Sequence, residues 1–369
     1  MKILAISHEY PPIGGGGANA CMFLSKEMVK MGHEVTVVTS CFDDLINTEL
    51  DDGVTVIRVK ALRKKKDKST FFEMLSFLIN AVRTTNKLAK VKHYDISVIF
   101  FGIPSGPVGL MLRRKYGIPY VIRFGGGDIP GSQKRFELIY KAINPFIRSI
   151  WKNASALIAN SEGLRERAER FENRYEIKII ENGVDSDFFK RQTDYVIEDE
   201  IQLLFVSRLI EGKGLQFIIP KMREINDRVG KKVSLTIVGD GPYREELERL
   251  SNEYVTFLGR KEKEKLPSIY SSAHVFILPS LSEGMPNVVL EAMAASLPIA
   301  MTDCEGSKEL IKDNGMVSSI DCFVDNLIEL LRNNENLIRM SENSRKRATE
   351  MFTWESKAAR YLDIMRKSV

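Results

Sequence analysis

Short apolar runs alternate with longer amphipathic stretches along the whole chain, and this alternation restricts the possible folds more than any other feature. Short runs rich in Val, Ile and Phe are typical of buried strands, and apolar residues spaced three or four apart are typical of helices. Such alternation predicts a parallel sheet with helices on both faces. We expect strands over residues 3–7, 34–39, 54–59, 96–100, 119–123, 156–160 and 177–180, and again over 202–206, 234–238, 256–258, 275–278 and 299–301.

The pattern occurs twice, and 369 residues exceed the size at which one hydrophobic core keeps growing. Residues 182–200 are rich in acidic side chains and lack apolar periodicity, which is typical of a linker. We therefore expect two doubly wound, Rossmann-like α/β domains, over residues 1–188 and 189–352, with the boundary near Phe189. Ligands bind beyond the carboxyl ends of the strands in such sheets, so two facing domains would line one cleft.

Composition excludes several classes of protein. A hydrophobic content of 44% with 28% charged residues is ordinary for a globular protein. The net charge of +5, from 54 basic and 49 acidic residues, is too small and dispersed to indicate nucleic-acid binding. The four cysteines lack zinc-site, redox or disulfide spacing, which favours a reducing cytoplasm. Residues 3–6 are too short an apolar run for a signal peptide, and glycines and prolines interrupt the most apolar stretch, 96–112, so no spanning helix is expected.

One basic cluster stands out from the dispersed charge. It precedes Thr70 and Glu73, which have the spacing of a helix capping box, and an amphipathic stretch follows. Two interpretations remain open: a helix on an anionic membrane surface, or a solvated charge run before a core helix. The cluster consists of Arg63, Lys64, Lys65, Lys66 and Lys68.

A glycine loop, Gly14 to Gly17, follows the first expected strand and leads into a helix. Backbone amides in such a loop can approach an anion at the helix amino terminus. The loop does not match a dinucleotide fingerprint, because Asn19 replaces the third glycine and the second strand lacks a ribose-binding carboxylate after it. A nicotinamide-dependent oxidoreductase is therefore a disfavoured alternative.

Arg208 and Lys213 lie in a glycine-containing loop after the expected strand 202–206. Two cations at this spacing can hold a diphosphate from two directions. Two solvated surface charges are the alternative.

Residues 279–295 are the most informative segment. They follow the expected strand 275–278, and Pro286 suits the first turn of a new helix. Glu283 lies just before this helix, whereas Glu291 interrupts an apolar run within it, and a buried carboxylate needs a partner. Hydroxyl groups of a sugar or a ribose would be suitable partners for these carboxylates. The alternative is that Glu283 caps the helix and Glu291 pairs with a neighbouring cation.

Together these segments resemble family 4, also called group 1, of the retaining glycosyltransferases, which have the GT-B fold. The resemblance covers nearly the whole length, and the spacing of Glu283 and Glu291 matches the paired-glutamate motif of the family. Further matching segments are 14–17, 32–39, 182–185, Arg208 with Lys213, 238–242 and 257–259.

The resemblance implies roles for individual residues. Arg208 and Lys213 would hold the donor diphosphate, and Glu291 the ribose. Fixed cations, with no cofactor or metal ion, would then stabilise the leaving group. The C-terminal helix, about residues 353–369, would pack back on the first domain. The transferred sugar would contact Glu283 and the backbone of Gly284, Met285, Pro286 and Asn287, and the phosphates would contact the amides of Gly15 and Gly16.

Two positions depart from the family pattern. Asp128, on the acceptor side in the loop 123–131, stands where many relatives have a histidine, and Glu305 stands where glycine is common.

The expected function is retaining, metal-independent transfer of a hexose or aminosugar, from a UDP-sugar by preference. The expected acceptor is a glycan or lipid-linked glycan in cell-surface polysaccharide biosynthesis, lipopolysaccharide included. The protein would be cytoplasmic, with peripheral contact at the inner face of the membrane left open, and a non-catalytic sugar-binding protein is the second alternative.

Overall fold

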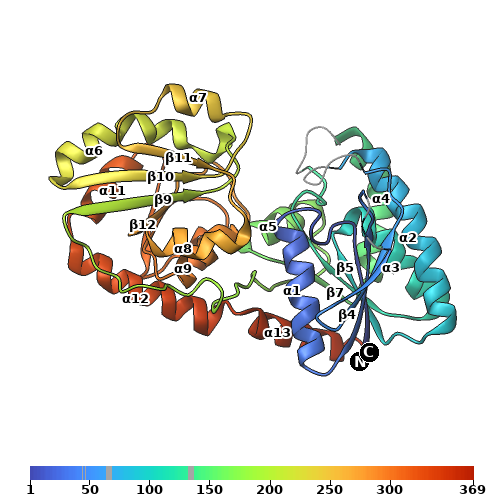
Figure 1. The fold of residues 1–369 in the computed structure, drawn as a ribbon. Coiled ribbons are helices and arrows are strands. Elements are labelled where there is room, and N and C mark those ends of the chain that lie inside the picture. Colours follow the sequence, from blue (N-terminus) through green and yellow to red (C-terminus); the bar gives the residue numbers. More distant parts are fainter. Residues whose placement is uncertain (44, 46, 64–68, 132–136) are drawn as a thin grey trace. The chain divides into compact units, whose positions relative to one another are not determined.

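The computed structural model describes residues 1–43, 45, 47–63, 69–131 and 137–369. The chain forms two compact units, one of Met1–Asn182 with Trp354–Val369 and one of Gly183–Thr353. Each unit contains a largely parallel sheet with helices packed on it (Figure 1). The predicted pair of Rossmann-like α/β sheets is therefore confirmed.

The first unit has, among its described residues, an eight-stranded sheet in the order β3-β4-β2-β1-β5-β6-β7-β8. Neighbouring strands are parallel except β3, which pairs antiparallel with β4. The chain winds outward from β1 to one side and then from β5 to the other, so the topological switch point lies between β1 and β5. The strands are β1 (Lys2–Ser7), β2 (Glu34–Ser40), β3 (Thr48–Asp51), β4 (Val54–Val59), β5 (Ile96–Phe100), β6 (Tyr120–Arg123), β7 (Ala156–Ala159) and β8 (Ile177–Ile179).

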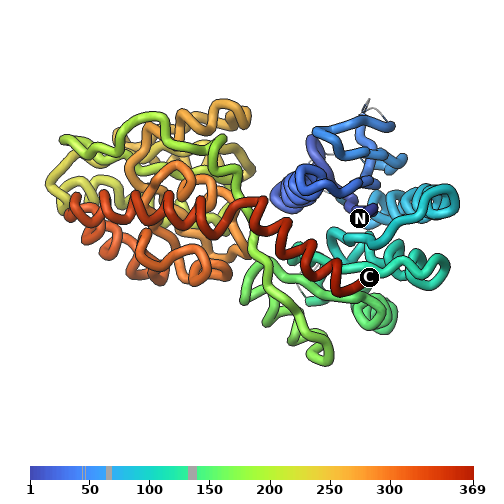
Figure 2. Tube along the Cα trace, turned by 90° about the horizontal axis from the view of Figure 1, so that it is seen from below, coloured from blue at the N-terminus to red at the C-terminus, as the bar shows by residue number. Residues whose placement is uncertain are grey.

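Helices bury both faces of this sheet, in two separate apolar clusters. The helix pair α1 (Gly16–Lys30) and α13 (Trp354–Arg366) covers one face, and the Trp354 ring stacks on Phe23 at 5.4 Å. The last helix thus completes the core of the first unit, and its red trace runs beside the blue α1 (Figure 2). The other face is covered by α2 (Phe71–Val91), α3 (Gly102–Tyr116), α4 (Glu137–Asn153) and α5 (Glu162–Phe171).

The second unit contains a six-stranded parallel sheet in the order β11-β10-β9-β12-β13-β14. Its switch point lies between β9 and β12. The strands are β9 (Glu200–Val206), β10 (Lys232–Val238), β11 (Val255–Gly259), β12 (Val275–Leu278), β13 (Ile299–Thr302) and β14 (Gly315–Ser318). The α-helices are α6 (Met222–Val229), α7 (Arg244–Arg249), α8 (Leu266–Ser271), α9 (Asn287–Ala294), α10 (Ser307–Leu310), α11 (Phe323–Leu331) and α12 (Asn334–Met351).

Two strands, β3 and β14, were absent from the sequence-based expectation. Both lie at a sheet edge and contain residues that are partly exposed, so neither has the apolar run that marks a central strand. The capping box at Thr70 is confirmed: its hydroxyl accepts a hydrogen bond from the Glu73 amide, and the Glu73 carboxylate accepts one from the Thr70 amide. Within the described part of the chain, no helix is long and apolar enough to cross a membrane.

Candidate functional site

Two loops meet at the switch point of the second sheet: residues 207–214 after β9 and residues 279–286 after β12. Gly214 adopts φ +76°, and a Cβ there would lie 1.9 Å from the Pro279 carbonyl oxygen. The Leu281 amide donates to the Gly212 carbonyl at 2.9 Å. Only glycine allows this backbone approach, so the two loops are fixed against each other.

These loops bring Lys213 and Glu283 together. The Lys213 ammonium donates to Oε1 of Glu283 at 2.5 Å, and the two side chains are only 18% and 11% exposed. Arg208, the other predicted diphosphate ligand, lies in the first of the two loops directly after β9 and is exposed. In this arrangement the Lys213 ammonium can leave the Glu283 carboxylate for an anionic ligand, and the exposed Arg208 guanidinium can bind the same ligand.

Glu291 lies on α9, and its partner is a tyrosine. The Tyr270 hydroxyl of α8 donates to Oε2 of Glu291 at 2.9 Å, while the Tyr270 ring is fully buried. Burial raises the pKa of Glu291, and the hydrogen bond from Tyr270 opposes that rise. Sequence reasoning missed Tyr270, because nothing near it in the chain indicates that its hydroxyl reaches a residue on another helix.

The alternative in which Glu283 caps a helix is wrong. Pro286 is the residue that precedes α9, and no side chain accepts a capping hydrogen bond there. Glu283 instead faces Lys213. The loop after β13 packs against the same segment: Gly306 adopts φ +82°, and a Cβ on it would lie 2.3 Å from the Gly284 carbonyl oxygen. The backbone of Gly284, Met285 and Pro286 is thereby fixed from a second side.

In the first unit, the glycine loop ends where α1 begins, with Gly15 as the amino-terminal cap residue and Gly16 as the first helical residue. Glu9 packs against this loop, since a Cβ on Gly14 would lie 2.5 Å from its Oε2, and it forms an ion pair with Arg63 at 3.1 Å. The neighbouring His8 is largely buried, which lowers its pKa to about 4, so its imidazole is neutral near pH 7.

Asp128 is 4% exposed, and both of its carboxylate oxygens bind backbone amides of its own unit. Oδ2 accepts from Gly102 at 2.6 Å and Oδ1 from Gly125 at 2.9 Å. Burial raises the pKa of Asp128 although these amides favour its charged form. The geometry is that of a residue that holds two loop segments together, and contact with an acceptor stays a prediction.

The structure corrects the composition of the basic cluster. The Arg63 side chain is only 2% exposed and pairs with Glu9, so Arg63 is not available to a membrane surface. Lys64, Lys65, Lys66 and Lys68 lie outside the described residues. The helix after them, α2, exposes four large apolar side chains near its start: Phe71, Phe72, Leu75 and Ile79.

One Asp-x-Asp tripeptide, Asp185-Ser186-Asp187, must be considered because such a spacing can bind a metal ion. In the structure, Asp185 accepts a hydrogen bond from the Phe188 amide at 3.0 Å and closes a turn. The Asp187 side chain is 96% exposed and lies 4.0 Å from Arg345. Metal-independence therefore stays a prediction that rests on Arg208 and Lys213.

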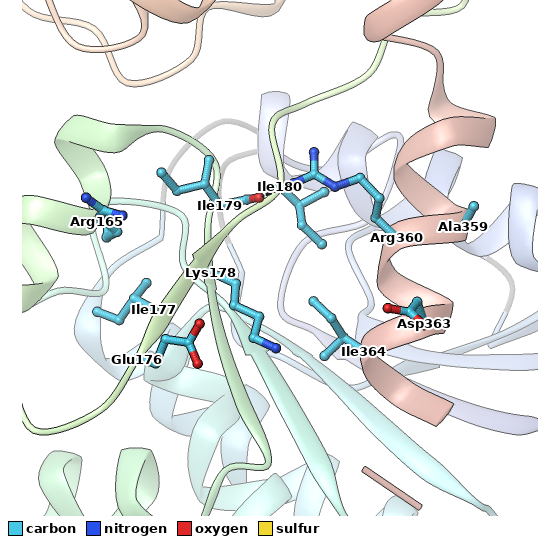
Figure 3. Close-up of a pocket in the computed structure, with 10 residues that line it drawn as sticks. All are labelled: Arg165, Glu176, Ile177, Lys178, Ile179, Ile180, Ala359, Arg360, Asp363 and Ile364. Atoms are coloured by element: carbon cyan, nitrogen blue, oxygen red, sulfur yellow. Dashed lines mark hydrogen bonds between the residues drawn. The ribbon is translucent and has the colours of Figure 1, made fainter. Parts of the chain in front are cut away.

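A groove of about 690 Å³ lies on the first unit between β8 and α13 (Figure 3), and none of the predicted site residues is among the residues that line it. Arg360 of α13 donates to the Ile179 carbonyl at 2.5 Å and to Glu181 at 2.7 Å. These bonds attach the C-terminal helix to the edge strand β8 and to the segment that follows it, so Arg360 has a structural role in the groove wall.

Comparison with known families gave two matches. The Glycosyltransferase Family 4 model matches residues 14–188, and the Glycosyl transferases group 1 model matches residues 200–333. An uncharacterized glycosyltransferase of Methanocaldococcus jannaschii is 29% identical over 99% of this chain and 97% of its own length. A GDP-mannose-dependent alpha-(1-6)-phosphatidylinositol monomannoside mannosyltransferase of Mycobacterium tuberculosis is 25% identical over 99% of this chain and 98% of its own length.

Solved structures share the fold. Sucrose-phosphate synthase from Thermosynechococcus elongatus superimposes with a TM-score of 0.81 at 20% identity, covering 100% of this chain and 98% of that one. HepE of Anabaena, solved in complex with UDP and glucose, gives a TM-score of 0.73 at 18% identity, with 99% of both chains covered.

Proposed function

This chain belongs to the group 1 glycosyltransferases of family 4, and from that premise we propose that it transfers a hexose or aminosugar, with retention, from a UDP-sugar to a glycan or lipid-linked acceptor. The observation that carries the proposal is the Lys213–Glu283 pair at the switch point of the second sheet. This is where a doubly wound sheet binds its ligand.

In the proposed donor complex, the Lys213 ammonium exchanges Glu283 for a donor phosphate, and Arg208 binds the diphosphate from the other end of the same loop. Preorganised cations of this kind stabilise the leaving group, and one such contact is typically worth about a hundredfold to a thousandfold in rate. Glu283, once released, accepts hydrogen bonds from hydroxyls of the transferred sugar, beside the backbone of 284–287.

Glu291 would bind the ribose hydroxyls. Its Tyr270 contact supports this role, because the hydroxyl occupies one carboxylate oxygen and orients the group while the other oxygen can accept from a ligand. In the first unit, the amides of Gly15 and Gly16 at the start of α1 are proposed to contact the donor phosphates.

UDP is the proposed nucleotide, and GDP is the competing one. HepE was solved with UDP, whereas the mycobacterial relative is named as GDP-mannose-dependent. The proposed acceptor is a cell-surface polysaccharide precursor or a lipid-linked glycan, made at the inner face of the membrane by a cytoplasmic protein. The phosphatidylinositol-containing acceptor in the name of that relative supports a lipid-linked acceptor.

The test is a panel of nucleotide sugars, each incubated with the purified protein and candidate acceptors while released nucleotide is measured. Release from one UDP-sugar, together with an NMR coupling constant that shows an unchanged anomeric configuration, is the expected result. Binding of a sugar without nucleotide release from any donor would instead favour the non-catalytic sugar-binding protein.

A further inference from the structure

Phe101 directly follows β5, at the switch point of the first sheet, and it has an unusual backbone conformation. Its φ is +73° and its ψ is +124°, in a region that large L-residues rarely adopt. Neighbouring groups hold it there. The Phe101 amide donates to the Arg123 carbonyl at 3.0 Å, and the next amide, that of Gly102, donates to Asp128.

This conformation directs the Phe101 ring between two loops. A Cβ on Gly17, at the start of α1, would lie 2.4 Å from Cζ of the ring. A Cβ on Gly125, in the loop after β6, would lie 2.2 Å from Cδ1 and from Cε1. The His8 ring meets the same phenyl ring edge-on at a centroid distance of 5.1 Å. Because it is confined on these sides, the ring has little room to move away from an added methyl group.

We propose that the Phe101 ring is a spacer that sets the separation of the glycine loop, 14–17, from the loop 123–131 and thereby positions both for substrate binding. Phe101 is a positioning residue in this assignment, and its backbone conformation is maintained by Asp128. The inference rests on the proposed function, since the glycine loop is there assigned to the donor phosphates and the Asp128 loop to the acceptor.

The ring contacts predict that two substitutions at Phe101 relieve different contacts. Leucine lacks the distal ring atoms Cε and Cζ, which are the atoms close to Gly17, but it keeps branched carbons near the position of Cδ1, which is close to Gly125. Phe101→Leu should therefore make room for Gly17→Ala and not for Gly125→Ala. Phe101→Ala should make room for both.

The experiment compares the single variants Gly17→Ala and Gly125→Ala with their combinations with Phe101→Leu and Phe101→Ala. Alanine in place of glycine within a helix ordinarily raises stability. We expect Gly17→Ala to lower the melting temperature when Phe101 is retained and to raise it in the Phe101→Leu background. The donor KM should rise about tenfold in Gly17→Ala, with recovery in the double variant. Gly125→Ala should raise the acceptor KM, and adding Phe101→Leu should not bring that KM back to its original value.

Phe100→Leu is the matched control. Phe100 is the preceding residue, is 2% exposed on the regular strand β5, and should lose stability without a change in either KM. Deuterium uptake of peptides that cover 14–19 and 124–131, measured without substrates, tests the spacer role of Phe101 separately from the functions assigned to the two loops. Increased uptake in Phe101→Ala at both peptides with unchanged KM values would retain the spacer and contradict the assigned loop functions. Unchanged uptake, or no rescue of Gly17→Ala, would overturn the spacer itself.

Discussion

The Lys213 ammonium and the Glu283 carboxylate lie 2.5 Å apart although the two residues are 70 positions apart in the sequence. The pair joins the residue proposed to bind the diphosphate to the one proposed to orient the sugar. Each therefore affects the other even before a ligand is present, and their substitutions should not act independently.

Glu283→Gln should lower kcat by about tenfold or more while the affinity for UDP changes little. The amide keeps the shape and loses the charge that strengthens a hydrogen bond to a sugar hydroxyl. Isothermal titration with UDP and initial rates with the donor sugar would measure the two effects. A loss of UDP affinity that follows the loss of stability would mean that Glu283 is only structural.

Lys213→Ala should weaken UDP binding by about tenfold, because a charge-assisted contact to a phosphate is lost. In a double-mutant cycle with Glu283→Gln, the combined effect on affinity should be smaller than the sum, since either single variant already removes the Lys213–Glu283 ion pair. Additive effects would indicate that the observed ion pair has no role in donor binding.

Tyr270→Phe should make UDP binding more sensitive to acid. Tyr270 donates to Glu291, which opposes the rise in the pKa of Glu291 caused by burial. Without the hydroxyl, that pKa rises further. The carboxylate form, which accepts from ribose hydroxyls, is present above the pKa and lost as the pH falls through it. The midpoint of the pH dependence of UDP affinity should thus move to higher pH in Tyr270→Phe, and an unmoved midpoint would contradict the role of Glu291.

Activity should persist in EDTA and should not rise when manganese is added. Arg208 and Lys213 are expected to supply the positive charge for the leaving group, and Asp185 of the Asp-x-Asp tripeptide is occupied with a backbone amide. Initial rates with and without chelator would measure this. Activity abolished by EDTA and restored by manganese would refute metal-independence, and Asp187→Asn would then show whether the tripeptide is responsible.

Neutralising Lys64, Lys65, Lys66 and Lys68 to glutamine should reduce flotation with anionic vesicles, because each basic residue near such a surface contributes about 1 kcal/mol. Phe72→Ser, at an apolar side chain of α2 that is 75% exposed, should act in the same direction. Arg63→Gln is the control: it breaks a buried ion pair with Glu9 and should cost roughly 3 kcal/mol of stability. Flotation that is unchanged in the lysine variant would show that the helix start is not a lipid contact.

Local sequence patterns determined much of the architecture. Apolar runs such as 96–100 and 275–278 identified buried strands, and their alternation with helices identified two parallel sheets, because burial on both faces requires continuous apolar strands. The capping box at Thr70 was visible for the same reason, since a helix cap joins residues three apart. The segments after the strands also marked the loops that carry the candidate site.

Tertiary structure alone decided which side chains meet. The partner of Glu283 is Lys213, that of Glu291 is Tyr270, and that of Arg63 is Glu9. The edge strand β14 and the backbone conformation of Phe101 were likewise not predicted from the sequence. These features depend on the order of strands in a sheet and on contacts between segments far apart in the chain. Periodicity reports which face of a strand or helix is buried, but it carries no information on what lies against that face.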